Sequence, residues 1–235
     1  MKYQWAAASH KGRVRNNNED SYAPATAGRG TGPVVLMVAD GMGGAIGGEI
    51  ASQLAVEHAS TGSGSPVERV IRANEAVVER TVSEPGLAGM GTTLTLAEFG
   101  DDGTVNLAHV GDSRAYLWHQ GLLEQLTDDH TVVAEQLAAG HISPADAVSH
   151  PQRSMLTRVL GISPEIDVDS ISFDSEAGDR ILICSDGLTN MVEDDRVAQL
   201  LAKGSPEEAV WALIEEATRA GGHDNITVVV VDVEQ

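Results

Sequence analysis

The sequence is poor in basic residues. It has 15 Lys and Arg against 35 Asp and Glu, which gives a formal net charge of −20 at pH 7. Nucleic acids are bound through clustered Lys and Arg, so this balance argues against a nucleic-acid partner. The same excess of acid repels phosphorylated ligands unless cations are bound where the acids gather.

Cysteine, aromatic residues and long apolar runs are also scarce. Cys184 is the only cysteine, which excludes an internal disulfide framework and fits a reducing compartment. No apolar run approaches the ~20 residues of a membrane span, and the segment MKYQWAAASHKG has no signal-peptide core. Aromatics make up 3% of the chain, so its core must be built from Val, Leu, Ile and Ala. We therefore expect a cytoplasmic protein with no membrane partner.

The hydrophobic pattern predicts one domain, residues 1–235, rich in antiparallel strands. The Asp-Gly turn in segment 99–105 and the HQG segment at 119–121 each join two strands as a hairpin. Hairpins in series indicate antiparallel sheets and not repeated βαβ units. Alternation and turn residues place the strands at 3–9, 34–39, 92–98, 105–109, 114–119, 122–126, 166–173, 180–184 and 226–233.

Two capping boxes mark the starts of helices. SPVE at 65–68 and SPEE at 205–208 both place Ser at the N-cap, Pro at the first helical position and Glu at the third. A third helix is expected from about Gly48 through EIASQLAVEHA. Segment 131–150, inside an insertion at about 128–155, predicts two short helices joined by a turn. We interpret this insertion as a flap between strands.

The stretch LMVADGMGG, residues 36–44, leaves an apolar strand at Asp40 and then has three glycines within four residues. Two functions fit this pattern. The glycines could let backbone N–H groups wrap a phosphate. Alternatively, Asp40 could be a metal ligand, with the glycines leaving room for an ion and its waters. The stretch alone does not decide between them.

At several other points of the chain, an acid lies where a strand end meets a turn of small or polar residues. Each one alone is most simply a turn residue that bonds its own backbone. Several carboxylates that converge at strand ends would repel one another and be driven toward protonation unless cations neutralise them. Oxygen ligands without a His/Cys cluster favour Mg²⁺ or Mn²⁺. The acids concerned are Asp112 in HVGDSRAY, Asp186 in ILICSDGL, Asp224 in GGHDNITVVV, and Glu19 and Asp20 in RNNNEDS.

Taken in order, the motifs RNNNED, VADGMGG, GTT, VGDSRAY, LTRVLG, ICSDGLTNMV and DNIT resemble one known family. It is the protein phosphatase 2C (PPM) family of metal-dependent protein serine/threonine phosphatases, and the likeness is greatest to its short bacterial branch. The match runs from about Gly12 to Val231. It implies an α+β fold, a four-layer αββα sandwich in which two central antiparallel β-sheets are flanked by helix pairs, with a small flap insertion. With this resemblance, DGMGG is a metal loop and not a phosphate loop.

The resemblance also assigns metal ligands. Asp40 would bridge two metal ions, and the carbonyl of Gly41 would add a ligand. Glu19 would complete the second site, while Asp186 and Asp224 would hold the first.

Three further residues receive roles from the same resemblance. Asp20 would orient metal-bound water, and Asp112 would help Asp186 hold a third, weaker ion. Arg15 would bind the substrate phosphate, a bidentate role that suits a guanidinium group. The alternative for Arg15 is a surface cation paired with a neighbouring acid.

The implied reaction is hydrolysis of phosphoserine and phosphothreonine in proteins, by attack of a hydroxide that bridges two Mn²⁺ or Mg²⁺ ions. Phosphorylated proteins, Ser/Thr kinases among them, are the expected partners, and the enzyme would reverse kinase signalling as a monomer. Cys184 is expected to be a core residue and not a nucleophile. Two alternatives stay open: a catalytically silent regulatory module, and a metal-dependent hydrolase of small phosphoesters.

The chain departs from the family pattern at two positions. Met42 stands where many eukaryotic relatives have a histidine thought to protonate the leaving oxygen. Ala45 stands where several bacterial relatives keep a histidine. No general acid can therefore be assigned, although His109, His150 and His223 lie near motifs.

Overall fold

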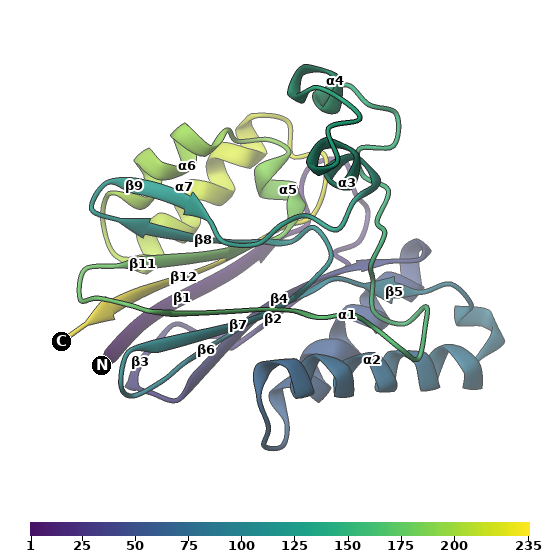
Figure 1. Cartoon of the computed structure of the whole chain (residues 1–235), viewed down its shortest axis with the longest axis horizontal. Coiled ribbons are helices and arrows are strands. Elements are labelled where there is room, and N and C mark those ends of the chain that lie inside the picture. Colours follow the sequence, from purple (N-terminus) through teal and green to yellow (C-terminus); the bar gives the residue numbers. More distant parts are fainter.

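Two antiparallel sheets packed face to face form the centre of the molecule, and helices cover both outer faces (Figure 1). The computed structural model describes residues 1–235, except the side chain of Ala45. The layers confirm the predicted α+β sandwich with two central sheets.

The first sheet has the strand order β3-β1-β12-β11-β8-β9. Along β12, Val228 and Val230 face the helix layer, while Val229 and Val231 face the other sheet. A strand buried on both faces needs an unbroken apolar run, which explains the VVVV segment. The strands are β1 (Lys2–His10), β3 (Gly28–Thr31), β8 (Arg114–His119), β9 (Leu122–Gln125), β11 (Arg180–Cys184) and β12 (Ile226–Glu234).

The second sheet has the order β10-β7-β6-β4-β2, and β5 pairs with the end of β4. In β4, Leu36 and Val38 pack between the sheets, whereas Met37 and Ala39 pack against the helices. The strands are β2 (Asp20–Ala23), β4 (Val34–Met42), β5 (Gly91–Thr92), β6 (Leu94–Phe99), β7 (Thr104–Val110) and β10 (Asp169–Asp174).

A pair of helices covers each sheet (Figure 1). Helices α1 (Gly44–Ser60) and α2 (Pro66–Ser83) pack on the second sheet, and α6 (Asp194–Leu201) and α7 (Pro206–Arg219) pack on the first. The capping boxes predicted at Ser65 and Ser205 are both formed. Two short helices, η1 (Pro85–Leu87) and α5 (Asp186–Thr189), complete the layers.

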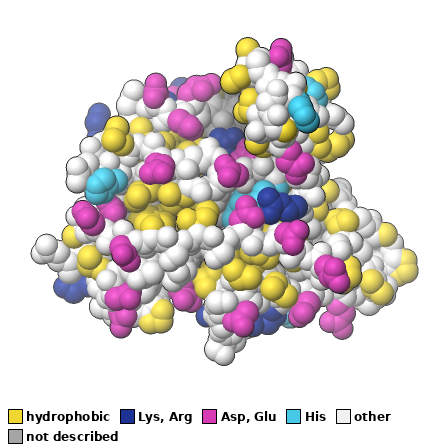
Figure 2. All heavy atoms as spheres, in the orientation of Figure 1, with side chains coloured by type: hydrophobic (Ala, Val, Ile, Leu, Met, Phe, Trp, Pro, Cys, Tyr) yellow, Lys and Arg dark blue, Asp and Glu magenta, His cyan; other side chains and the backbone are white. Residues whose placement is uncertain are grey.

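The flap contains the two short helices predicted for it, α3 (Val132–Ala138) and α4 (Pro144–Val148). An isolated antiparallel bridge between Thr131 and Leu156 joins the two chain segments at the base of the flap. Figure 2 shows the flap standing out from the rest of the molecule at the upper right. No described helix is long and apolar enough to cross a membrane.

Several elements differ from the sequence prediction. Strand β3 was missed because its Gly-Arg-Gly-Thr sequence has low strand propensity. It forms because it pairs with β1, and a Cβ on Gly28 would lie 2.4 Å from the Trp5 ring. Strand β2 and helix α6 were also missed, the strand predicted at 166–173 begins at Asp169, and α1 begins at Gly44, before Gly48.

Candidate metal centre

One pocket of about 750 Å³ opens where strands of both sheets end. Its walls come from the β1–β2 loop, the end of β4, the β7–β8 turn, the start of α5 and the α7–β12 loop. All but one of the predicted site residues line it: Arg15, Glu19, Asp40, Gly41, Asp112, Asp186 and Asp224. The remaining one, Asp20, is buried and lies opposite Asp40 in the register of β2 and β4.

Gly41 allows the backbone to pack tightly beneath the pocket. Its N–H donates to the carbonyl of Glu19 over 3.2 Å. A Cβ at this position would lie 2.0 Å from the carbonyl oxygen of Gly48 and 2.6 Å from that of Glu19. The glycine is therefore required by close backbone approach, which brings the Glu19 loop, β4 and α1 together.

Asp20 is held beneath the pocket on one side of its carboxyl group. Its Oδ2 accepts hydrogen bonds from Ser185 Oγ (2.8 Å) and Thr227 Oγ1 (2.6 Å). Its Oδ1 is buried without a partner among the described residues. Burial raises the pKa of Asp20 to about 7, although the two hydroxyl donors oppose the rise.

The pocket acids destabilise one another as anions. Burial raises the pKa of Asp112 to about 8 and that of Asp186 to about 6, with nearby carboxylates adding to each rise. The pKa of Asp40 is raised well above its usual range by burial and then by Asp20 and Asp186. Bound cations would favour the charged forms of all of these acids.

Asp186 repeats the pattern of Asp20. Its Oδ2 accepts from Asn190 Nδ2 over 2.8 Å, while its Oδ1 is buried and has no partner in the part of the chain that the structure describes. A buried polar atom without a partner needs an explanation, and in a pocket lined by acids a bound cation supplies one. The two orphan oxygens, on Asp20 and Asp186, lie at strand ends of different sheets.

Arg15 lies at the rim of the pocket and pairs with Asp224. Its Nη2 is 2.6 Å from Asp224 Oδ2, and its side chain is 52% exposed. This is the ion pair that was the alternative interpretation of Arg15. The same contact holds the guanidinium group at the pocket, so phosphate binding by Arg15 stays a prediction.

The donor set fits a hard cation by its chemistry. It consists of carboxylates and a backbone carbonyl, the ligands that Mg²⁺ and Mn²⁺ prefer. The orphan oxygens of Asp20 and Asp186 support the same fit. Within the described residues, however, no three His, Cys, Asp or Glu side chains are already arranged as a metal-binding group. The fit therefore rests on donor type and unmet hydrogen-bonding capacity.

Sequence reasoning missed the residues that hold the acidic loops in place. Thr93 Oγ1 accepts from the N–H of Asp40 over 2.9 Å, and the N–H of Thr93 donates to the carbonyl of Asp40. His130 Nδ1 accepts from the N–H of Gly111, next to Asp112, and its Nε2 donates to Asp169. The GTT motif was the available signal for Thr93, but no local pattern distinguished His130.

The three histidines that lie near motifs have different environments in the structure. His223 lines the pocket and is exposed. His109 is fully buried between Thr95 and the carbonyl of Asp128, and burial lowers its pKa to about 4. His150 lies in the flap and is not among the residues that line the pocket.

Of the two departures from the family pattern, Met42 lines the pocket, and the side chain of Ala45 lies outside the described residues. Cys184 is a core residue as predicted, and burial raises the pKa of its thiol to about 12.

Comparison with known proteins points in one direction. The family described as protein phosphatase 2C matches residues 8–209. The serine/threonine protein phosphatase PstP of Mycobacterium tuberculosis is 42% identical over 240 residues, covering 98% of this chain and 45% of the relative. This chain therefore spans about half the length of that relative. The serine/threonine phosphatase stp of Listeria monocytogenes is 38% identical over 236 residues, covering 94% of this chain and 92% of the relative.

Solved structures agree with these sequence matches. The catalytic domain of PstP in complex with two manganese ions superposes with a TM-score of 0.88 at 38% identity. The match covers all of this chain and 99% of that structure. A crystal structure of the M. tuberculosis phosphatase PstP/Ppp gives a TM-score of 0.89 at 41% identity, with full coverage of both chains.

Proposed function

Because this chain belongs to the protein phosphatase 2C family, we propose that it is a metal-dependent phosphatase that hydrolyses phosphoserine and phosphothreonine in proteins. The observation that carries the proposal is the group of acids with raised pKa values at one pocket. Asp20 and Asp186 each also have a buried carboxylate oxygen without a hydrogen-bond partner among the described residues. Such a pocket favours cations, and cations are needed to bring a phosphate group into an acidic site. None of the acids expected of an active enzyme is missing, which argues against a catalytically silent module.

The metal ligands would be the side chains of Glu19, Asp40, Asp186 and Asp224 and the carbonyl of Gly41. They would hold two ions, Mn²⁺ or Mg²⁺, and Asp112 with Asp186 would hold a third. When bound, the ions would activate water for attack on phosphorus and neutralise charge on the phosphoryl group.

The chain's own side chains would place the substrate and the water. Arg15 reaches the pocket rim, where its planar guanidinium group can bind two phosphate oxygens. Asp20 is fixed by Ser185 and Thr227, so its free Oδ1 has one orientation in which to accept a proton from water. Cys184 is excluded as a nucleophile because it is buried and its thiol pKa is about 12.

We extend the proposal to the cellular role. The enzyme would act as a cytoplasmic monomer, one domain over residues 1–235, and would oppose Ser/Thr kinases by dephosphorylating their targets and the kinases themselves. A single buried cysteine and a net charge of −20 support this setting.

A direct assay tests the proposal. An aryl phosphate and a phosphothreonine peptide would each be incubated with the protein in Mn²⁺ and in EDTA. We expect turnover of both in Mn²⁺ and of neither in EDTA. Turnover of the aryl ester alone would show a hydrolase of small phosphoesters, and turnover of neither in Mn²⁺ would overturn the enzyme assignment.

A further inference from the structure

A second hollow lies beside the metal pocket, between the start of α1 and the segment that follows α2. One wall contains Gly43, Gly44, Ile46 and Gly47, and the other is residues 83–87. Its volume is about 630 Å³. We call this second hollow the apolar groove. It adjoins the metal pocket at Gly43 and Gly44, which line both hollows.

The groove exposes large apolar side chains. Ile46, which lines the groove, is 68% exposed. Val82 is 78% exposed; it precedes the far wall in sequence and is not among the residues that line the groove. Leu87 and Pro85 add to that wall. Figure 2 shows hydrophobic side chains along the right-hand edge of the molecule, where α2 ends. Apolar side chains that gather on the surface beside a catalytic pocket indicate a contact site.

Gly43 and Gly44, the two described residues that the hollows share, carry no side chain that could separate them. A Cβ on Gly44 would meet no atom within 4 Å, and the same holds for Gly86 on the far wall. An extended peptide with its phosphorylated residue in the metal pocket could therefore cross Gly43 and Gly44 and place a neighbouring side chain in the groove.

Charge selects the kind of side chain. Among the described residues that line the groove, Glu84 is the charged one, and Arg80 pairs with it at 2.9 Å. The groove thus offers no cation for an acidic flank, and a net charge of −20 disfavours acidic peptides further. A large aliphatic side chain has the complementary chemistry.

We propose that the apolar groove binds a large aliphatic side chain that flanks the phosphorylated residue of the substrate protein, and that Ile46 selects it. The inference rests on the proposed phosphatase function and names a substrate class for it. Contact with a hydrophobic wall of this kind is worth about tenfold in kcat/KM. Because the contact lies away from phosphorus, it affects peptides and not aryl phosphates.

The test uses phosphothreonine peptides that carry Leu, Ser or Asp at successive positions on either side of the phosphothreonine. They would be compared on the wild type, on Ile46→Ser and on the matched control Leu122→Ser. Leu122 is a 75% exposed aliphatic residue at the start of β9, and it lines neither hollow. Turnover in Mn²⁺ and binding by fluorescence anisotropy would both be measured, with an aryl phosphate as the reference substrate.

We expect a Leu flank at one position to raise kcat/KM by about tenfold over Ser in the wild type and in Leu122→Ser. In Ile46→Ser the preference should disappear while aryl phosphate turnover is unchanged. If Ile46→Ser kept the same preference for a Leu flank, or if the wild type had no such preference, the proposed role of the groove would be wrong. If no substrate is turned over, the phosphatase assignment fails, and the anisotropy series still decides whether Ile46 selects a Leu flank.

Discussion

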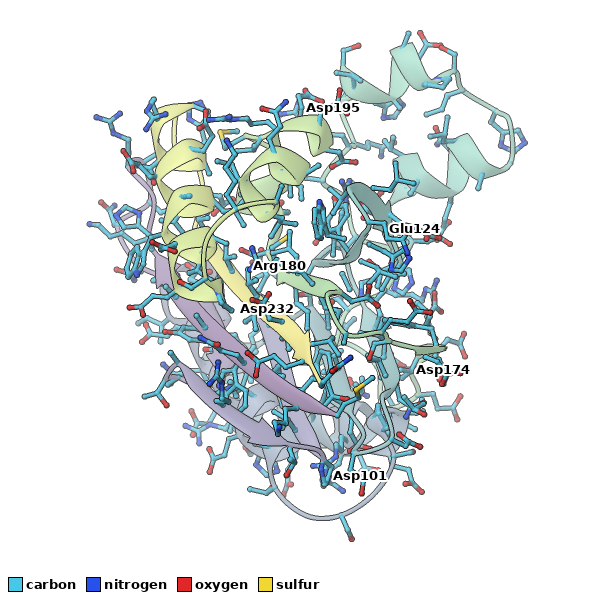
Figure 3. All side chains as sticks on the ribbon, turned by 90° about the vertical axis from the view of Figure 1, so that its left-hand side faces the viewer. Asp101, Glu124, Asp174, Arg180, Asp195 and Asp232 are labelled. Carbon is cyan, nitrogen blue, oxygen red and sulfur yellow. The ribbon has the colours of Figure 1, made fainter. Side chains whose placement is uncertain are left out.

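The charged residues at the two ends of β11 differ in how far their hydrogen-bonding capacity is satisfied. At its start, Arg180 is almost fully buried, and it binds both oxygens of Asp232, at 2.5 and 2.8 Å. The guanidinium group also donates to the carbonyls of Leu201, Lys203 and Gly204 (Arg180 and Asp232 are labelled in Figure 3). Just beyond the other end, Asp186 lies among other acids and keeps a buried oxygen with no partner among the described residues.

The difference separates a structural ion pair from a ligand site. Every oxygen of the Asp232 carboxylate has a donor, so that end of the strand is complete without any ligand. The acids at the Asp186 end have raised pKa values and unmet hydrogen-bonding capacity, and a bound cation would stabilise their charged forms. Mutations at the two ends should therefore have opposite signatures.

The largest effect is expected from Asp186→Asn or Asp40→Asn. Each removes a negatively charged ligand from the proposed ions, whose stabilisation of the reaction amounts to several kcal/mol. Turnover should fall by about 10²- to 10⁴-fold. The fold should be retained in EDTA, because a crowded buried charge has been removed.

Calorimetric titration and melting curves with Mn²⁺ provide the check. Wild-type stability should rise by about 2.7 kcal/mol at a hundredfold excess of Mn²⁺ over Kd, and the variants should lose most of that gain. An unchanged Mn²⁺ isotherm in Asp40→Asn would remove this residue from the metal site.

Arg180→Met should have the reverse signature. It leaves Asp232 and three carbonyl groups without this donor. Breaking a buried pair of this type costs about 3 kcal/mol of unfolding free energy. Denaturant unfolding should show that loss equally in Mn²⁺ and in EDTA, while kcat of the folded enzyme stays at the wild-type value. A loss of activity without a loss of stability would contradict the structural role of the pair.

The sequence predicted local features of the fold and site well. The capping boxes at Ser65 and Ser205 involve residues three apart, so the pattern itself contains the whole interaction. The VVVV run of β12 likewise predicts a strand buried on both faces. Each pocket acid could be identified because it lies in a family motif.

Features that depend on distant contacts could not be predicted. Strand β3 exists because of β1 and Trp5, and its own residues do not favour a strand. The hydrogen bond from the N–H of Gly111 to His130 Nδ1 joins residues that are 19 positions apart in the sequence. Arg15 was assigned to phosphate on the family resemblance, but only the folded chain shows that it pairs with Asp224.

The pocket acids also predict an unusual pH dependence of stability. The pKa values of Asp20 and Asp112 are raised to about 7 and about 8, so the folded state binds their protons more tightly than the unfolded state does. The stability from these groups is complete below an ordinary Asp pKa of about 4 and is lost progressively from there until pH has passed the folded pKa values of about 7 and about 8. In EDTA, the unfolding free energy should therefore fall between about pH 6.5 and 8.5.

In that pH range the buried histidines contribute little to the pH dependence of stability. His109 and His130 have lowered pKa values, so they are neutral in the folded protein above about pH 6.5, where unfolded histidine is also mostly neutral. Asp112→Asn should flatten the slope, and saturating Mn²⁺ should flatten it too because the ion replaces the protons. Stability that rises with pH in EDTA across this window would contradict the crowding of these acids.

The smallest predicted effect concerns the flap, and here the structure changes which residue to test. Sequence analysis defined the flap only as an insertion at about 128–155, and within it Glu135 lines a different hollow, together with Arg158 and Asp169. The flap residues that line the metal pocket are Arg153 and Ser154. Arg153 is exposed and donates to the carbonyl of Val148 within the flap, so it can contact a bound phosphopeptide without supporting the core.

Arg153→Ala should lower phosphopeptide kcat/KM by about two- to fivefold, the value of an exposed charge contact of about 0.5–1 kcal/mol. Aryl phosphate has no flanking residues to reach Arg153, so its kcat/KM should change less than the peptide value. Glu135→Ala is the matched control in the same flap and should alter neither substrate. Equal losses on both substrates in Arg153→Ala would mean that the flap acts on the metal site itself, and a loss on neither would mean that Arg153 does not contact the peptide.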